Sequence, residues 1–165
     1  MLDSMVENPR PTRAEITDVA NAVLDGSDAC MLSAESASGK YPFKCIRTMH
    51  EIIRDVEQNQ EQYYKISLEN EFLSVAGSIG ASASLSALKL NAKIIVCLTT
   101  SGLTANIISG FRPKARIISV TDNIATLNRL ELIWGIQTLP ILPYQTLEDV
   151  VQQVEQLLIS YGLAK

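Results

Sequence analysis

A short segment rich in hydroxyl and glycine residues follows an apolar run and precedes a helical pattern. The run Ile94–Leu98 predicts a strand buried on both faces, and residues 105–109 predict a helix that ends at Gly110. Between them lie Thr99, Thr100, Ser101, Gly102, Leu103 and Thr104. Such a turn directs N–H and O–H donors toward one point at a helix N-terminus, which favours a phosphate. The alternative is that Ser101 or Thr104 only caps the helix.

A second candidate pair, Ser33 and Glu35, follows the short apolar run 29–32, which predicts a buried strand. Active sites of (β/α)8 barrels form at the carboxyl ends of the strands, so these two residues are candidates for an active-site wall. Hydrogen bonding within their own loop is the alternative role. The single histidine, His50, falls on a predicted apolar helix stripe and is expected in a core or an interface.

Other catalytic chemistry is not indicated by the residue pattern. Histidine and cysteine residues lack the spacing of a metal site, so no metal ligand is predicted. The hydroxyl-rich segment also lacks the lysine of a GxxxxGK[ST] phosphate loop. On residue chemistry alone, the chain is a binding module or part of an enzyme.

The composition excludes several classes of protein. The chain has 165 residues, of which 47% are hydrophobic and 19% charged, and this predicts a globular fold. A net charge of −4 gives no support to nucleic-acid binding, and no apolar run reaches transmembrane length. The three cysteines are far apart in apolar contexts, which predicts reduced thiols in a cytoplasmic protein.

The first third of the chain has the pattern of βα units. Thr12 and Glu15 form a predicted capping box for a helix over residues 13–24, which Asp25-Gly26 ends. After the run 29–32 and a loop over residues 33–39, a helix is predicted from Pro42 to Gln58. Its inner stripe is expected to be Ile46, Met49, His50, Ile53 and Val56. This order of helix, strand, loop and helix is typical of βα units but lacks a first strand, which is expected before Met1.

The polar segment 58–71 is the best candidate for a domain boundary. A helix over residues 72–90 follows, with small residues that permit close helix–sheet packing, and Asn91 ends it. Further strands are predicted at 94–98, 117–120 and 136–142, with helices at 123–132, capped by Thr121-Asp122, and at 147–161, capped by Thr146. Three βα units predict a parallel, three-layer domain in which Thr99, Thr100 and Thr121 gather at the carboxyl ends of the strands. A three-stranded sheet leaves an edge exposed, so the C-terminus is expected to be cut short.

The segment from Asn8 to Pro42 closely resembles the pyruvate kinase family. Its PRPTRAE, DVANAVLDG and MLSAESA segments and the Tyr41-Pro42 pair match the motifs of that family. Downstream, LTTSGLTA (residues 98–105) and FRP (residues 111–113) resemble its C-terminal domain. The resemblance implies an α/β fold in two incomplete parts: the last βα units of a (β/α)8 TIM barrel over residues 1–60, and a three-layer α/β/α domain with a mainly parallel sheet over residues 61–165.

The resemblance also implies a function. Pyruvate kinases transfer a phosphoryl group from phosphoenolpyruvate to ADP with Mg²⁺ and K⁺, and are usually homotetramers. Their catalytic lysine and metal ligands are expected before Met1, so this chain alone is predicted to be inactive. Within it, Ser33 and Glu35 fall near the active-site wall. Thr99, Thr100, Ser101, Gly102 and Thr104 match the effector loop that holds a phosphate of a sugar phosphate in many members.

Several residues depart from the family pattern. Ala34 stands for the usual glycine, Ser36 for a threonine, and Ser38 and Lys40 replace the usual lysine and acid of that loop, which puts a nucleotide contact there in doubt. Leu103 replaces a frequent arginine and removes a possible phosphate partner. The loop that closes over the effector is expected after Lys165. The alternative to a fragment of the enzyme is a non-catalytic α/β module that binds a sugar phosphate or another anion, and the sequence before Met1 would discriminate the two.

Overall fold

The computed structural model describes residues 1–58 and 73–163. The chain divides into two compact units, Met1–Tyr63 and Tyr64–Lys165. Most of the predicted boundary segment, the first residue of the helix predicted from Phe72, and residues 164–165 lie outside the described residues.

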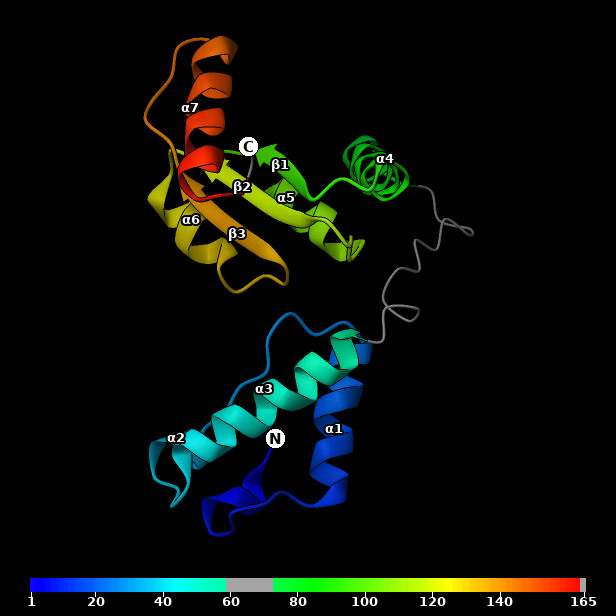
Figure 1. Ribbon diagram of the computed structural model, residues 1–165, viewed down its shortest axis with the longest axis vertical. Coiled ribbons are helices and arrows are strands. Elements are labelled where there is room, and N and C mark those ends of the chain that lie inside the picture. Colours follow the sequence, from blue (N-terminus) through cyan, green and yellow to red (C-terminus); the bar gives the residue numbers. More distant parts are fainter. Residues whose placement is uncertain (59–72, 164–165) are drawn as a thin grey trace. The chain divides into compact units, whose positions relative to one another are not determined.

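The first unit is helical (Figure 1). Its elements are the 3₁₀ helix η1 (Asp3–Val6) and the α-helices α1 (Arg13–Leu24), α2 (Ala34–Ala37) and α3 (Pro42–Gln58). The bounds predicted for α1 and α3 are confirmed, and so is the capping box of Thr12 and Glu15 at the start of α1. Because capping involves residues only three apart, the sequence alone could place this helix start.

The core of the first unit confirms Met49 and Ile53 of the predicted inner stripe of α3, but Ile46 and His50 do not belong to it. Its fully or nearly buried residues are Leu2, Met5, Val19, Cys45 and Met49. Ile46 is 53% exposed and His50 is also exposed, so His50 is not a core residue. The inward face also contains Cys45 and Ile52, which lie four residues before and three residues after Met49 and so follow the helical period.

The strand predicted at residues 29–32 is not formed. Strands are held by hydrogen bonds to a neighbouring strand, and the described part of the first unit contains no other strand. Cys30 and Leu32 still pack against the core, whereas Met31 is 77% exposed. The loop predicted at residues 33–39 contains the single helical turn α2.

The second unit contains the predicted parallel sheet. Its strands are β1 (Ile94–Leu98), β2 (Arg116–Thr121) and β3 (Ile136–Pro140), in the order β1-β2-β3. In the register, Ile95 pairs with Ile117, and Ile117 pairs with Ile136. The strand β3 ends at Pro140, two residues earlier than predicted, and the Ile141 N–H after it still donates to the Thr121 carbonyl oxygen of β2 at 3.1 Å.

Helices cover both faces of this sheet and make three layers (Figure 1). On one face, α5 (Leu103–Gly110) and α6 (Ile124–Leu130) pack around Ile117, and on the other α7 (Leu147–Ser160) packs on Ile118. The central strand β2 is buried from Ile117 to Thr121. At the edge, Val96 and Leu98 are 38% and 37% exposed, so the prediction that β1 is buried on both faces was wrong.

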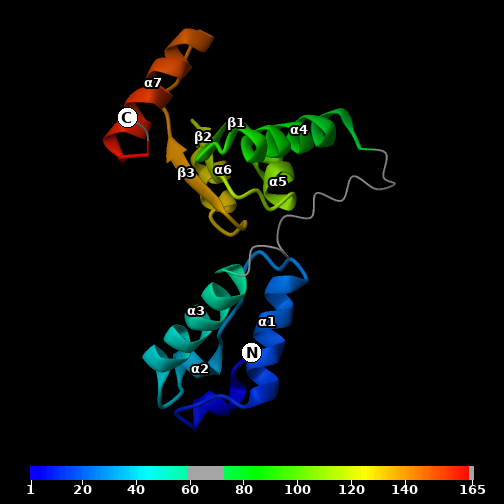
Figure 2. The ribbon, with the colours of Figure 1, turned by 45° about the vertical axis from the view of Figure 1, so that its right-hand side comes forward.

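The helix α4 (Val75–Leu90) packs beside α5 (Figure 2). Its small residues face inward, and a Cβ on Gly80 would lie only 2.7 Å from Ile107 Cγ2. The expected close approach is therefore present, but its main partner is a helix and not the sheet. The large apolar side chains Val75 and Ile79 point outward, 80% and 61% exposed. Asn91 ends α4, as predicted, and adopts the left-handed conformation (φ 50°).

Candidate functional site

The segment Thr99–Thr104, here called the hydroxyl loop, forms a tight turn at the carboxyl end of β1. The Thr99 N–H donates to the Val120 carbonyl oxygen at 3.1 Å, which ties the loop to β2. The Thr99 Oγ1 accepts a hydrogen bond from the Gly102 N–H at 2.9 Å. Gly102 has φ +82° and lies near Leu130 and Thr126, so the turn requires a residue without a side chain. The loop backbone is thereby fixed.

Neither Ser101 nor Thr104 is the N-cap residue of α5. The helix α5 begins at Leu103, two residues earlier than predicted, and its N-cap is Gly102, which has no side chain to cap it. Ser101 Oγ accepts only a long hydrogen bond, 3.4 Å, from the Leu103 N–H. Thr104 lies within the first turn, where backbone N–H groups have no acceptor in the helix. The exposed hydroxyls of Ser101 and Thr104 are therefore available to an anion.

Two residues of α6 complete the loop, and sequence reasoning missed both. The Thr126 hydroxyl donates to the Thr100 carbonyl oxygen at 2.8 Å. The Arg129 guanidinium donates to the Ser101 carbonyl oxygen and so places a cation beside the loop. Leu103, which stands where the family often has an arginine, is uncharged. The spacing of three residues between Thr126 and Arg129 puts both on one face of a helix, which was the available signal.

Thr121 lies at the carboxyl end of β2, as predicted, but its hydroxyl is used within its own turn. It follows Val120, which pairs with Leu98, so Thr121 ends β2 beside Thr99, the residue that follows β1. The Thr121 Oγ1 accepts from the Asn123 N–H within its own turn, at 3.1 Å. The cap of α6 is Asn123, whose Oδ1 accepts from the N–H groups of Ala125 and Thr126, so the prediction of a Thr121-Asp122 cap was wrong.

Glu35 in the first unit serves its own loop and the N-terminal segment. It is only 4% exposed, and its carboxylate accepts from the Ser33 N–H at 2.8 Å, the Leu2 N–H at 3.0 Å and the Met1 amino group at 3.3 Å. The backbone hydrogen bond from Ser33, with further bonds that outweigh burial, lowers the pKa of Glu35 to about 2. The group is an anion at neutral pH and therefore cannot donate a proton there.

Ser33 lies beside Glu35 on a cavity of about 390 Å³ that Cys30 also lines. Ser33 is exposed and sits at the N-cap position of α2 without capping it through its side chain. The placement of Ser33 and Glu35 in an active-site wall stays a prediction.

Metal ligands do not cluster in the part of the chain that the structure describes. No group of three histidine, cysteine, aspartate or glutamate residues there could hold a metal ion. The three cysteines are free thiols, as predicted, with Cys45 and Cys97 buried and Cys30 half-buried. Among the described helices, none has the length and apolarity needed to cross a membrane.

Two carboxylates make the first unit sensitive to acid. Burial alone would raise the pKa of Glu15, but hydrogen bonds from Ser4 and Thr12 outweigh it and lower the pKa to about 2, as low as that of Glu35. Because both values lie below the ordinary 4.5, the stabilisation is complete above about pH 4.5 and is lost as the pH falls toward 2. Each group contributes at most about 3 kcal/mol.

We therefore expect the melting temperature of the first unit to fall steeply below about pH 4.5, followed by circular dichroism of the full chain. Glu15→Gln should flatten this dependence, and the exposed Glu51→Gln should leave it unchanged. An equal slope in all three proteins would contradict the assignment.

Two family models match the chain. The description "Pyruvate kinase, barrel domain" fits residues 1–46, and "Pyruvate kinase, alpha/beta domain" fits residues 77–165. A pyruvate kinase of Geobacillus stearothermophilus is 42% identical over the whole chain, and "Pyruvate kinase 2" of Synechocystis is 43% identical over 92% of it. The chain spans 28% and 25% of the lengths of these two relatives.

Solved structures agree with the sequence matches. Two crystal structures of a Cryptosporidium parvum pyruvate kinase superpose with TM-scores of 0.86 and 0.84 at 36% identity. Each covers 99% of this chain, which corresponds to 34% and 35% of theirs. The parallel sheet with helices on both faces confirms the α/β fold that the sequence predicted. This chain belongs to the pyruvate kinase family.

Proposed function

We propose that the chain is part of a cytoplasmic enzyme that transfers a phosphoryl group from phosphoenolpyruvate to ADP, forming pyruvate and ATP. The observation that carries this proposal is the match of both its units to domains of one enzyme family. Mg²⁺ and K⁺ would act in the whole enzyme. The described residues do not offer them a ligand set, so no step is assigned to them within this chain.

An assay of the product of the complete gene tests the activity. With phosphoenolpyruvate and ADP, we expect ATP formation that requires Mg²⁺ and K⁺, whereas this chain alone should show none. A complete gene product that lacks the activity but still binds sugar phosphates would instead favour the non-catalytic module.

The hydroxyl loop is proposed as the regulatory site, where it would hold one phosphate of a sugar phosphate. Three features support this role: the exposed hydroxyls of Ser101 and Thr104, the first-turn N–H groups of α5, and the Arg129 cation. They combine uncharged donors with a positive charge around one turn, which suits a phosphate dianion.

Thermal melting with millimolar fructose 1,6-bisphosphate or sulfate should reveal this binding. A ligand that binds only the folded state at about 100 times its Kd adds about 2.7 kcal/mol of stability. We expect the shift to disappear in the double variant Ser101→Ala, Thr104→Ala, and Arg129→Gln to weaken binding about ten-fold. The control Ser78→Ala, Ser82→Ala removes two exposed hydroxyls of α4 and should keep the shift. Equal shifts in all variants would rule out this loop.

We also propose that the protein is a homo-oligomer, a tetramer by family resemblance. The outward apolar face of α4, with Val75 80%, Ile79 61% and Leu90 79% exposed, supports contact with another copy. Light scattering of Ile79→Glu measures this, because a buried carboxylate at the contact would favour dissociation.

A further inference from the structure

A cleft lies at the edge of the second unit where the strands begin, which is the opposite end of β1 from the hydroxyl loop. Its volume is about 350 Å³, within the range of small-molecule sites. The end of α4, the starts of β1 and β2, and the turn after α7 contribute to it. Here it is called the basic cleft.

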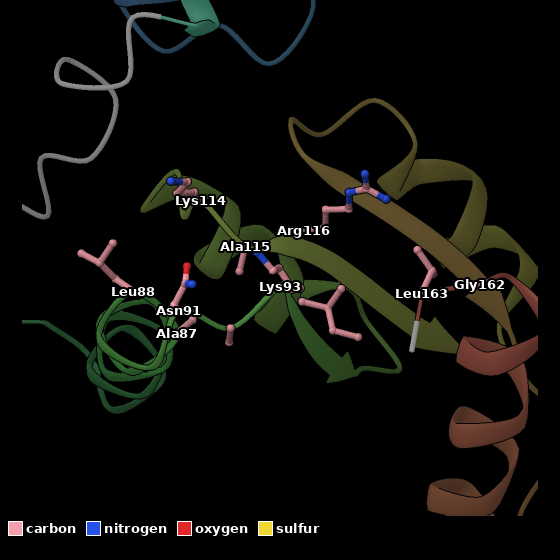
Figure 3. A pocket seen from close by; sticks show the side chains of 11 residues that line it. Ala87, Leu88, Asn91, Lys93, Lys114, Ala115, Arg116, Gly162 and Leu163 are labelled. Carbon is pink, nitrogen blue, oxygen red and sulfur yellow. The ribbon is translucent and has the colours of Figure 1, made fainter. Parts of the chain in front are cut away.

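Three cations line the basic cleft: Lys93, Lys114 and Arg116. Figure 3 shows Lys93 between Lys114 and Arg116, with α4 on one side and the turn at Gly162 and Leu163 on the other. All three are exposed. The described residues that line the cleft include no carboxylate, although the described second unit has Asp122, Glu131, Glu148, Asp149 and Glu155.

The helix ends nearby do not account for these charges. The C-termini of α4 and α7 reach the cleft, and each carries a partial charge of about −0.5. Backbone N–H groups already satisfy carbonyl oxygens at both ends: Ala92 donates to Ala87 at 2.9 Å, and Leu163 donates to Leu158 at 2.8 Å. Two partial charges cannot balance three full ones, so the cleft keeps a net positive charge in a chain of net charge −4.

The wall beside the cations is apolar. Ala87, Leu88, Ile94, Ala115 and Leu163 line it, so a hydrocarbon or aromatic body could lie against it. An arginine guanidinium binds phosphate oxygens in a bidentate manner, and lysines add compact charges. From this geometry we propose that the basic cleft binds a phosphate monoester carried on a small apolar or aromatic body. The site is separate from the hydroxyl loop and independent of its proposed role.

Isothermal titration calorimetry of the full chain with phenyl phosphate tests the proposal. The double variant Lys114→Gln, Arg116→Gln should bind at least about ten-fold more weakly than the wild type. The control Lys89→Gln, Lys44→Gln removes the same net charge from exposed positions outside the cleft and should keep the affinity. Inorganic phosphate, which has no apolar body, should bind the wild type more weakly than phenyl phosphate.

Four results would overturn the proposal. They are no binding at about 10 mM phenyl phosphate, equal weakening in the control variant, no preference over inorganic phosphate, and loss of binding only in Ser101→Ala, Thr104→Ala. The last would assign the ligand to the hydroxyl loop and leave the proposed function intact. Should the cleft double variant fail to fold, as judged by circular dichroism, the single variants Lys114→Gln and Arg116→Gln take its place, each with an expected three-fold loss.

Discussion

Replacing Glu35 by alanine is expected to lower the melting temperature of the first unit by more than about 10 °C. The Glu35 carboxylate accepts hydrogen bonds from the N–H groups of Leu2 and Ser33 and is 4% exposed. Each N–H group left buried without an acceptor costs about 1–3 kcal/mol, so the total loss should be about 3–4 kcal/mol. Circular dichroism melting of the full chain, with hydrogen exchange to identify the unit that unfolds, measures the effect.

Two variants control this experiment. Glu35→Gln keeps one oxygen acceptor and should lie between the wild type and Glu35→Ala. Glu51→Ala removes a carboxylate from an exposed position of α3 and should change stability by no more than about 0.5 kcal/mol. If Glu35→Ala proved as mild as Glu51→Ala, the hydrogen bonds of Glu35 would not hold the N-terminal segment.

Replacing Gly102 by valine is expected to destabilise the second unit by about 3–4 kcal/mol and to abolish anion binding at the hydroxyl loop. Two costs add here. At φ +82° a β-branched residue is strained by about 1–3 kcal/mol, and a Cβ would lie 3.0 Å from Leu130 Cδ2 and 3.3 Å from Thr126 Cγ2. Overpacking of this kind costs a further 1–3 kcal/mol or so. Thermal melting with and without millimolar sulfate reports both effects.

Gly135→Ala separates the two costs. Gly135 also has a positive φ, +69°, but a Cβ there would have nothing within 4 Å, so only the backbone strain applies. We expect a loss of about 1–2 kcal/mol in this variant, with anion binding retained. A loss as large as that of Gly102→Val would mean that contact with Leu130 and Thr126 adds nothing.

The ends of several helices could be predicted from the sequence, because each end depends on residues that are neighbours in the chain. The capping box at Thr12, the cap at Thr146 and the end of α4 at Asn91 are formed as expected. Each depends on residues within one helical turn, or on one backbone conformation, and tertiary packing does not have to supply the partner. The three parallel strands could also be predicted from the sequence, because runs of β-branched residues separated by helical segments are typical of βα units.

The inward faces of the helices and the presence of a strand were harder to predict from the sequence, because they depend on the elements that pack against them. The inward face of α3 contains Cys45 and excludes His50, and the inward face of α4 holds small residues while Ile79 points out. Apolar content alone predicts the opposite for α4, since only the closeness of Ile107 on α5 makes glycine the residue that fits at Gly80. Residues 29–32 have a strand-like composition but no neighbouring strand in the described part of their unit.

By itself, the sequence determined the family, the α/β class and the hydroxyl loop as a candidate anion site. The motifs and the order of strand, hydroxyl-rich turn and helix are local, and one chain segment contains them whole. Only the tertiary structure decided that Gly102 caps α5, that Arg129 brings a cation to the loop, and that Lys93, Lys114 and Arg116 share one cleft. These groups lie up to tens of residues apart in the chain, and packing of the sheet and its helices brings them together.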